Sequence, residues 1–208
     1  HFTNKASVNY TVTGETISIS EANDFSGATA GTVTATIEEQ TIAQILDSTD
    51  GLNADGGNNA FTIDISSTTA DAGDLASIHA LTSETVALDQ VTTLTGTFAE
   101  LKQYITDEDQ YTSKNNITTV TIDAQAIDGS GTNGTVAELI TFHTDIRDAA
   151  GDGHGTPNVD IANVTLLTGS HGDLTTIRTT NTFTNKADID YTVTGGTISI
   201  AQANTLSA

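Results

Sequence analysis

The chain contains the same 26-residue segment twice. Residues 2–27 read FTNKASVNYTVTGETISISEANDFSG, and residues 183–208 read FTNKADIDYTVTGGTISIAQANTLSA. Seventeen of the 26 aligned positions are identical, at a constant offset of 181 residues from Phe2 to Phe183. A repeat array returns to its own sequence in this way, whereas a single globular domain has no reason to do so. We therefore expect residues 1–182 to be one long repeat, and residues 183–208 to be the first rung of the next copy in a longer protein.

A shorter motif recurs inside the long repeat. It consists of Ser, Thr or Asp, two further residues, an acid or amide and a large apolar residue, as in Thr97-Phe-Ala-Glu100-Leu101. Such a hydroxyl and acid form the capping box of a helix, and a second apolar residue three positions later indicates two or three helical turns. The first motif places the cap at Ser20, and the last lacks a cap residue. The apolar landmarks are Phe25, Ile45, Leu75, Leu101, Leu139, Leu174 and Leu206.

These landmarks are spaced 20 to 38 residues apart, so that about six degenerate rungs fill residues 1–182. Segments in which Val, Ile, Tyr and Thr alternate lie between the expected helices and predict half-buried strands. Two of these strands are expected to flank a turn at Gly14-Glu15. The segments are 10–13, 16–19, 33–37, 61–65, 86–88, 92–94, 120–122, 164–166 and 191–194.

Strands that alternate with helices usually form parallel sheets, and a unit of about thirty residues cannot bury its apolar face alone. We therefore predict an α/β fold: a solenoid-like stack of short parallel β-strands with one short capped helix per rung. The uneven rung lengths leave open an alternative of β-rich, compact repeat domains. In the stacked arrangement, the last rung exposes an apolar face for another copy, in the same chain or in a neighbouring one.

The charge of the chain is strongly negative. With 27 acidic and six basic residues the net charge is −21, which excludes nucleic acids and anionic lipid surfaces as partners. The absence of cysteine excludes a disulfide framework and thiol chemistry. No run of 18 apolar residues is present, so we predict no membrane span. The acidity indicates either solubility and adaptation to salt, or the binding of calcium.

Calcium prefers carboxylate, amide and hydroxyl oxygens on flexible loops, and three loops offer them. The first loop loosely resembles EF-hand and glycine–aspartate calcium loops, but it lacks the glutamate at position twelve and the nine-residue repeat. For each of the three, an ordinary solvated loop is the more common alternative. The candidate ligands are Asp47, Asp50, Asn53, Asp55 and Asn58 in the first loop, Asp128 and Ser130 in the second, and Asp148, Asp152 and Asp160 in the third.

The sequence contains no motif for catalysis: G-x-S-x-G, Walker, H-E-x-x-H and dinucleotide patterns are all missing. His79 and His143 occupy equivalent helical positions two rungs apart, too far for one zinc ion. The strand acids Asp64, Asp89 and Asp123 have no matching basic or aromatic set. We therefore predict that the chain is not an enzyme.

The long duplication, the abundance of Thr, Asp, Ala and Gly, the acidity and the missing cysteine together resemble large repetitive extracellular proteins of bacteria, such as surface-layer, adhesin, sheath and filament proteins. This resemblance implies a structural repeat segment of a secreted cell-surface or filament-forming protein, with other copies or adjacent repeats as partners. An alternative is an adhesin or carbohydrate-binding module that contacts cell-surface polysaccharide. A third, weaker alternative is a secreted β-helix hydrolase.

Overall fold

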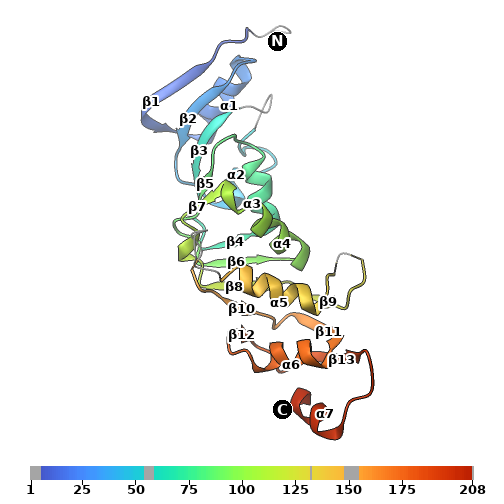
Figure 1. Cartoon of the computed structure of the whole chain (residues 1–208). Helices are drawn as coiled ribbons and strands as arrows, with labels where there is room; N and C mark the ends of the chain where they lie inside the picture. The colour runs from blue at the N-terminus through green and yellow to red at the C-terminus, as the bar shows by residue number, and fades with distance from the viewer. Residues whose placement is uncertain (1–5, 54–58, 132, 148–154, 208) are drawn as a thin grey trace. The chain divides into compact units, whose positions relative to one another are not determined.

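The computed structural model describes residues 6–53, 59–131, 133–147 and 155–207 (Figure 1). Contacts divide the chain into two compact units. Unit 1 comprises His1–Val91 and Asp107–Asn116, and unit 2 comprises Thr92–Thr106 and Ile117–Ala208. This boundary lies inside the expected long repeat of residues 1–182, and the repeat organisation stays a prediction from the sequence.

Unit 1 is built around a five-stranded parallel sheet. Its strands are neighbours in the order β1, β2, β3, β5 and β7, which is also their order along the chain (Figure 1). The elements of unit 1 are β1 (Tyr10–Ile17), α1 (Ile19–Ala28), β2 (Val33–Ile37), α2 (Ile42–Ile45), β3 (Ala60–Asp64), β4 (Thr69–Asp71), α3 (Ala72–His79), β5 (Val86–Ala87) and β7 (Tyr111–Thr112), with 3-10 turns η1 (Glu108–Gln110) and η2 (Lys114–Asn116).

Unit 2 contains two groups of parallel strands. In one, β6, β8, β10 and β12 pair successively; in the other, β9, β11 and β13 do so. Helix α4 packs on α5, α5 on α6, and α6 on α7. The elements of unit 2 are β6 (Thr93–Gly96), α4 (Phe98–Thr106), β8 (Thr119–Ile122), β9 (Gln125–Ile127), α5 (Val136–Asp145), β10 (Asn158–Asp160), β11 (Val164–Ser170), α6 (His171–Thr179), β12 (Phe183–Thr184), β13 (Asp190–Thr194) and α7 (Ile200–Ser207).

The prediction of an α/β fold with parallel strands is confirmed. Strand β2 shows why the alternating segments form strands: Val33, Ala35 and Ile37 are buried, while Thr34 and Thr36 face solvent. Successive side chains of a strand point to opposite faces, so this composition places every apolar side chain of β2 in the core. The fully buried side chains of the protein are mainly Ile, Leu and Val, with a few Phe.

The seven apolar landmarks lie in the seven α-helices of the described residues, as the motif predicts. Thr41, Thr97 and Thr135 each share reciprocal hydrogen bonds with the residue three positions later, which closes the capping boxes of α2, α4 and α5. Asp71 and Ser170 cap α3 and α6 by accepting early helical N–H groups.

The predicted cap of the first helix is wrong. Helix α1 is capped by Ser18, which forms a capping box with Glu21, and Ser20 lies inside the helix. The last helix has a cap as well: Ser199 Oγ accepts from Gln202 N at 3.3 Å, and Gln202 Oε1 accepts from Ser199 N at 2.8 Å. Ser18 and Ser199 are equivalent in the two copies, so the duplication includes the capping box.

The prediction of two strands around Gly14-Glu15 is also wrong. A single strand, β1, spans Tyr10–Ile17, and its register against β2 shifts between Thr11 and Thr16. Gly14 has φ +87°, a conformation that favours glycine and lets the strand bulge instead of turning back. Ile19, expected in the second strand, begins α1.

No helix in the described part of the chain is long and apolar enough to cross a membrane.

Candidate functional site

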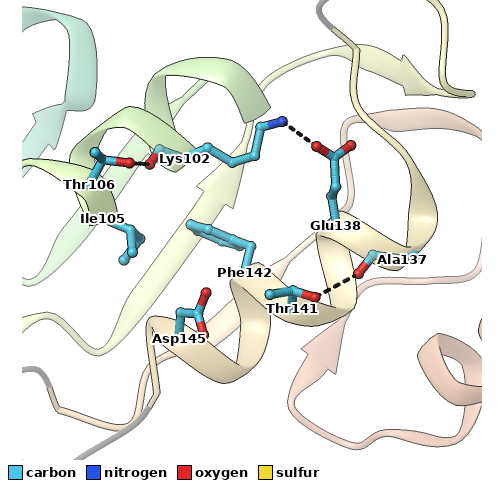
Figure 2. A pocket seen from close by; sticks show the side chains of 8 residues that line it. All are labelled: Lys102, Ile105, Thr106, Ala137, Glu138, Thr141, Phe142 and Asp145. Carbon is cyan, nitrogen blue, oxygen red and sulfur yellow. Dashed lines mark hydrogen bonds and ion pairs between the residues drawn. The ribbon is translucent and has the colours of Figure 1, made fainter.

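A surface groove of unit 2 lies between α4 and α5 (Figure 2). It encloses about 360 Å³. Its apolar part is formed by Ile105, Phe142 and the carbon chain of Lys102, and Asp145 lies at the end away from the Lys102 amine (Figure 2). Two hydroxyls at its margin bond within their own helices, Thr106 to the Lys102 carbonyl and Thr141 to the Ala137 carbonyl.

An ion pair closes one end of this groove. Lys102 Nζ lies 3.0 Å from Glu138 Oε1, and Lys102 also lies over the ring of Phe98, 5.1 Å from its centroid. Glu138 Oε2 accepts from the backbone N–H of Thr135 at 2.7 Å, within the capping box of α5. The hydrogen bond from Lys102 and those from Thr135 hold the pKa of Glu138 below its usual range.

Beneath the groove the packing is aromatic. The rings of Phe98 and Phe142 meet edge to face with centroids 5.7 Å apart. Gly134, with φ +70°, approaches so closely that a Cβ there would lie 2.5 Å from the Phe98 ring. Phe142 is only 3% exposed, so its ring offers no platform on which a sugar ring can stack. The groove therefore has the chemistry of a helix–helix junction held by packing and one ion pair.

In the first loop, the predicted calcium ligand Asp47 organises a turn. Asp47 Oδ1 accepts from the N–H groups of Thr49 at 2.8 Å and Asp50 at 2.9 Å, which lowers the pKa of Asp47. Asn53 donates its own N–H to Asn23 Oδ1 of α1 at 2.8 Å. The structure thus assigns Asp47 to a turn and Asn53 to a contact with α1. Asp55 and Asn58 lie outside the described residues.

The second loop is organised by one carboxylate. Asp128 Oδ1 accepts from the N–H of Ser130 at 2.9 Å and from its hydroxyl at 2.6 Å, and Asn133 Nδ2 lies 3.4 Å away. These hydrogen bonds lower the pKa of Asp128, with the Ser130 hydroxyl as the largest cause. The structure thus brings Asp128 and Ser130 together, and they are hydrogen-bonded to each other.

In the third loop, Asp160 ends β10 and bonds in two directions. Its Oδ1 accepts from Ala162 N–H, and its Oδ2 accepts from Asn185 Nδ2, both at 2.9 Å. Asp148 and Asp152 lie outside the described residues. Within the described ranges, no group of three or more His, Cys, Asp or Glu side chains is arranged to hold a metal ion. Calcium at these loops stays a prediction.

Two of the helical histidines, His79 and His143, pack as aromatic side chains. His79, at the end of α3, meets Tyr111 edge-on at 6.2 Å between centroids. His143, in α5, stacks on Phe183 at 4.2 Å, and its Nε2 lies 2.7 Å from Thr182 Oγ1. Burial, followed by the charge of Arg147, lowers the pKa of His143. Each imidazole therefore ties a helix to a strand segment within its own unit.

Unit 1 brings together the carboxylates of Asp64, Asp89 and Glu39, which is not the set of strand acids, Asp64, Asp89 and Asp123, that the sequence suggested. Burial, then Asp89, then Glu39 raise the pKa of Asp64 at the end of β3. The bridge between Gln40 and Ile65 explains why Glu39 belongs to this group, because it places Glu39 beside Asp64. Asp123, which belongs to unit 2, does not contribute to the pKa shift of Asp64. Only the pairing of the strands reveals this neighbourhood.

Asparagines that link segments distant in the sequence were missed in the sequence. Asn59 is buried; its Oδ1 accepts from Val33 N–H at 3.1 Å and its Nδ2 donates to Ser26 Oγ at 2.9 Å. Asn23 of α1 donates to the Gly51 carbonyl at 2.9 Å and accepts from Asn53 N–H. The retention of Asn23 as Asn204 in the second copy is the signal that could have identified it.

Comparison of the chain with protein-family models, with curated proteins and with solved protein structures gives no match. The functional conclusion therefore rests on the residues and geometry of this chain.

Proposed function

We propose that this chain is a structural repeat segment of a secreted cell-surface or filament-forming protein, in which short rungs stack into an elongated solenoid. The observation that carries the proposal is the connectivity of the sheets. Each parallel pairing within a unit joins two strands that are separated in the chain by one α-helix, as in β1–α1–β2 and β11–α6–β13. Pairing between strands that follow each other along the chain supports the proposal, because a solenoid requires each rung to contact its neighbours in sequence.

The helices support the same proposal. In unit 2, each helix from α4 to α7 packs on the next one in the sequence. An isolated helix of eight to ten residues is marginal in water, so these helices depend on their neighbours and on their caps. We therefore expect a capped helix in every rung of a protein that is built from rungs and forms a mechanically continuous stack.

The surface charge of the chain fits a structural role better than the role of a compact catalytic domain. The net charge of −21 disfavours self-association through random contacts. The secreted or cell-surface location, and other copies of the repeat as partners, are part of this proposal and rest on the resemblance in sequence style.

We also propose calcium as a ligand of the three aspartate loops around residues 47–58, 128–130 and 148–160. Calcium that binds only the folded protein raises the melting temperature, because it adds stability that grows with the logarithm of its excess over Kd, about 2.7 kcal/mol at a hundredfold excess. Melting curves in calcium, in magnesium and in a chelator test this. An unchanged melting temperature in all three removes calcium from the account without affecting the stack.

Electron microscopy of the native protein purified from its source tests the structural role. Rods or filaments whose axial period matches one long repeat are the expected result. Dispersed round particles at the same protein concentration contradict it.

A further inference from the structure

The two copies of the repeated segment pair through opposite strand edges. In the first copy, β1 pairs with the strand that follows it, with Tyr10 opposite Val33. In the second copy, β13 pairs with the strand that precedes it, with Leu167 opposite Tyr191. β13 ends its sheet on the other side among the described residues. The YTVT strand therefore pairs with the following strand in the first copy and with the preceding strand in the second copy.

Equivalent side chains of the two copies also differ in burial, and the buried side is the side on which each strand has a neighbour. Ile19 is 8% exposed in the first copy, whereas its equivalent Ile200 is 83% exposed. Ala22 of α1 is fully buried, and its equivalent Ala203 faces solvent. On the other side the order reverses, because Val8 is 50% exposed and its equivalent Ile189 only 6%. Each copy thus lacks cover on the side where the other copy has a neighbour.

The neighbour that covers the first copy is the segment 30–53. Strand β2 of this segment pairs with β1 and packs on α1. At its far end, the segment is held by Asn23, whose amide donates to the Gly51 carbonyl and accepts from the Asn53 N–H. Asn204, the equivalent residue in α7, is exposed, and its side chain makes no hydrogen bond within the described residues.

A groove of about 350 Å³ lies between β13 and α7. Its apolar lining includes Ile189, Val193, Ile198, Ala203 and Leu206. In the first copy, the equivalents of Ile198 and Ala203 are the buried Ile17 and Ala22. Two of the apolar residues of this groove, Ile198 and Ala203, therefore lie at positions that are buried in the first copy, where the following segment is present.

We propose that β13 and α7 form a docking surface for residues 30–53 of a second copy of this repeat. The docking repeats the contacts of the first copy: Tyr191 lies opposite the incoming Val33, Ile200 is covered, and the Asn204 amide bonds to the incoming Gly51 and Asn53. This inference rests on the proposed repeat function and names the surface through which consecutive repeats join.

The charges of the two helices favour this occupant. The incoming segment is acidic, with Glu38, Glu39, Asp47 and Asp50, and it contains no basic residue. Helix α1 carries Glu21 and Asp24, whereas α7 contains no charged residue. An acidic segment thus meets less repulsion at α7 than at α1, where it is already bound.

A tandem chain tests the proposal directly. Residues 28–116 are appended after Ala208, which continues the 181-residue offset, and amide hydrogen exchange of residues 190–207 is compared between the original and the tandem chain. We expect exchange in β13 and α7 to slow by at least about tenfold in the tandem chain, because docking pairs the free edge of β13 and covers α7.

Two substitutions and one control define the surface. Ile200→Asp and Asn204→Ala should abolish the added protection in the tandem chain, while leaving the melting temperature of the original chain unchanged because both side chains are exposed there. Ala201→Asp adds the same charge as the first substitution at a position whose first-copy equivalent, Ser20, remains exposed beside the covering segment. It should keep the protection.

Unchanged exchange at residues 190–207 beside a protected appended segment would overturn the proposal. So would rapid exchange throughout the appended residues, since these residues need the docked rung as their neighbour. Loss of protection with Ala201→Asp would likewise show that the residues named here do not form the contact. Native filaments combined with unchanged exchange would place the joint between repeats on another surface, whereas protection in the tandem chain without native filaments would contradict the proposed function alone.

Discussion

Glu138 joins two structural elements of unit 2 through its two carboxylate oxygens. Oε1 pairs with Lys102 of α4 at 3.0 Å, and Oε2 accepts from the N-cap residue Thr135 at 2.7 Å. One side chain therefore both begins α5 and holds it to α4. The capping box of α2, which uses Thr41 and Gln44, shows that glutamine serves equally well at the capping position.

The two roles of Glu138 can be separated by substitution. Glu138→Gln keeps the capping box and loses the ion pair, which is a surface pair and contributes about 0–1 kcal/mol. Glu138→Ala loses both and should lower the free energy of unfolding by about 1 kcal/mol more. Urea denaturation of the two variants and of Lys102→Met measures the difference. Equal losses in Glu138→Gln and Glu138→Ala would contradict the capping role.

The position of the first cap gives a second prediction. Ser18→Ala removes the acceptor of the Glu21 N–H and should destabilise unit 1 by about 1 kcal/mol. Ser20→Ala, two residues later, lies inside the helix and should change stability by less than about 0.5 kcal/mol. Thermal melts of the two variants decide between the caps, and a larger loss for Ser20→Ala would favour the position predicted from the sequence.

The lowered pKa of His143 predicts that the stability of the protein depends on pH. Its folded-state pKa lies below the ordinary value of 6.5, because burial and Arg147 disfavour the imidazolium. The unfolded chain therefore binds the proton more readily, and the contribution of His143 is complete above about pH 6.5 and falls as the pH drops towards the folded-state pKa. Urea midpoints measured between pH 7 and pH 5 should decline.

His143→Gln should flatten this decline, whereas His79→Gln, which removes an imidazole from unit 1, should leave it in place. If both variants keep the slope of the original chain, another group controls this pH range. At pH 5 and above, carboxylates of lowered pKa such as Glu138 stay ionised and do not contribute to the decline.

Two glycines should respond in opposite ways to alanine. Gly134→Ala forces a side chain into φ +70° and against the Phe98 ring, so we expect a loss of about 1–3 kcal/mol. Gly172 lies in the first turn of α6, and a Cβ there meets nothing closer than Ser170 Oγ at 3.8 Å. Gly172→Ala should be neutral or stabilise by up to about 1 kcal/mol. Stability curves in urea compare the two, and a neutral Gly134→Ala would contradict the packing described for α4 and α5.

Much of the local structure could be predicted from the spacing of residues. Leu101 and Tyr104, or Leu139 and Phe142, lie three positions apart behind a capping box, and this local signal was sufficient to locate α4 and α5. Ser18 was missed because Phe25 lies seven residues after its cap, whereas Leu101 and Leu139 lie four residues after theirs. The strand β1 was divided in two because Gly14 is as compatible with a turn as with a bulge.

The non-local relationships could not be predicted in this way. The group of Asp64, Asp89 and Glu39 depends on which strands are neighbours, and rung lengths that vary from 20 to 38 residues conceal that pairing. The roles of Asp47 and Asp128 were equally hidden, because a carboxylate in a glycine-rich loop has the same sequence signature whether it organises a turn or binds a cation.

Small-angle X-ray scattering of chains with one, two and three tandem repeats tests the proposed stack most directly. If rungs add along one axis, by about 5 Å at the strands and up to about 10 Å at the helices, the radius of gyration should rise more than twofold from one repeat to three. A compact assembly of the same residues would grow by only about 1.5-fold, following the scaling of globular domains. That smaller increase, or a distance distribution with separate maxima for independent domains, would contradict the stacked repeat.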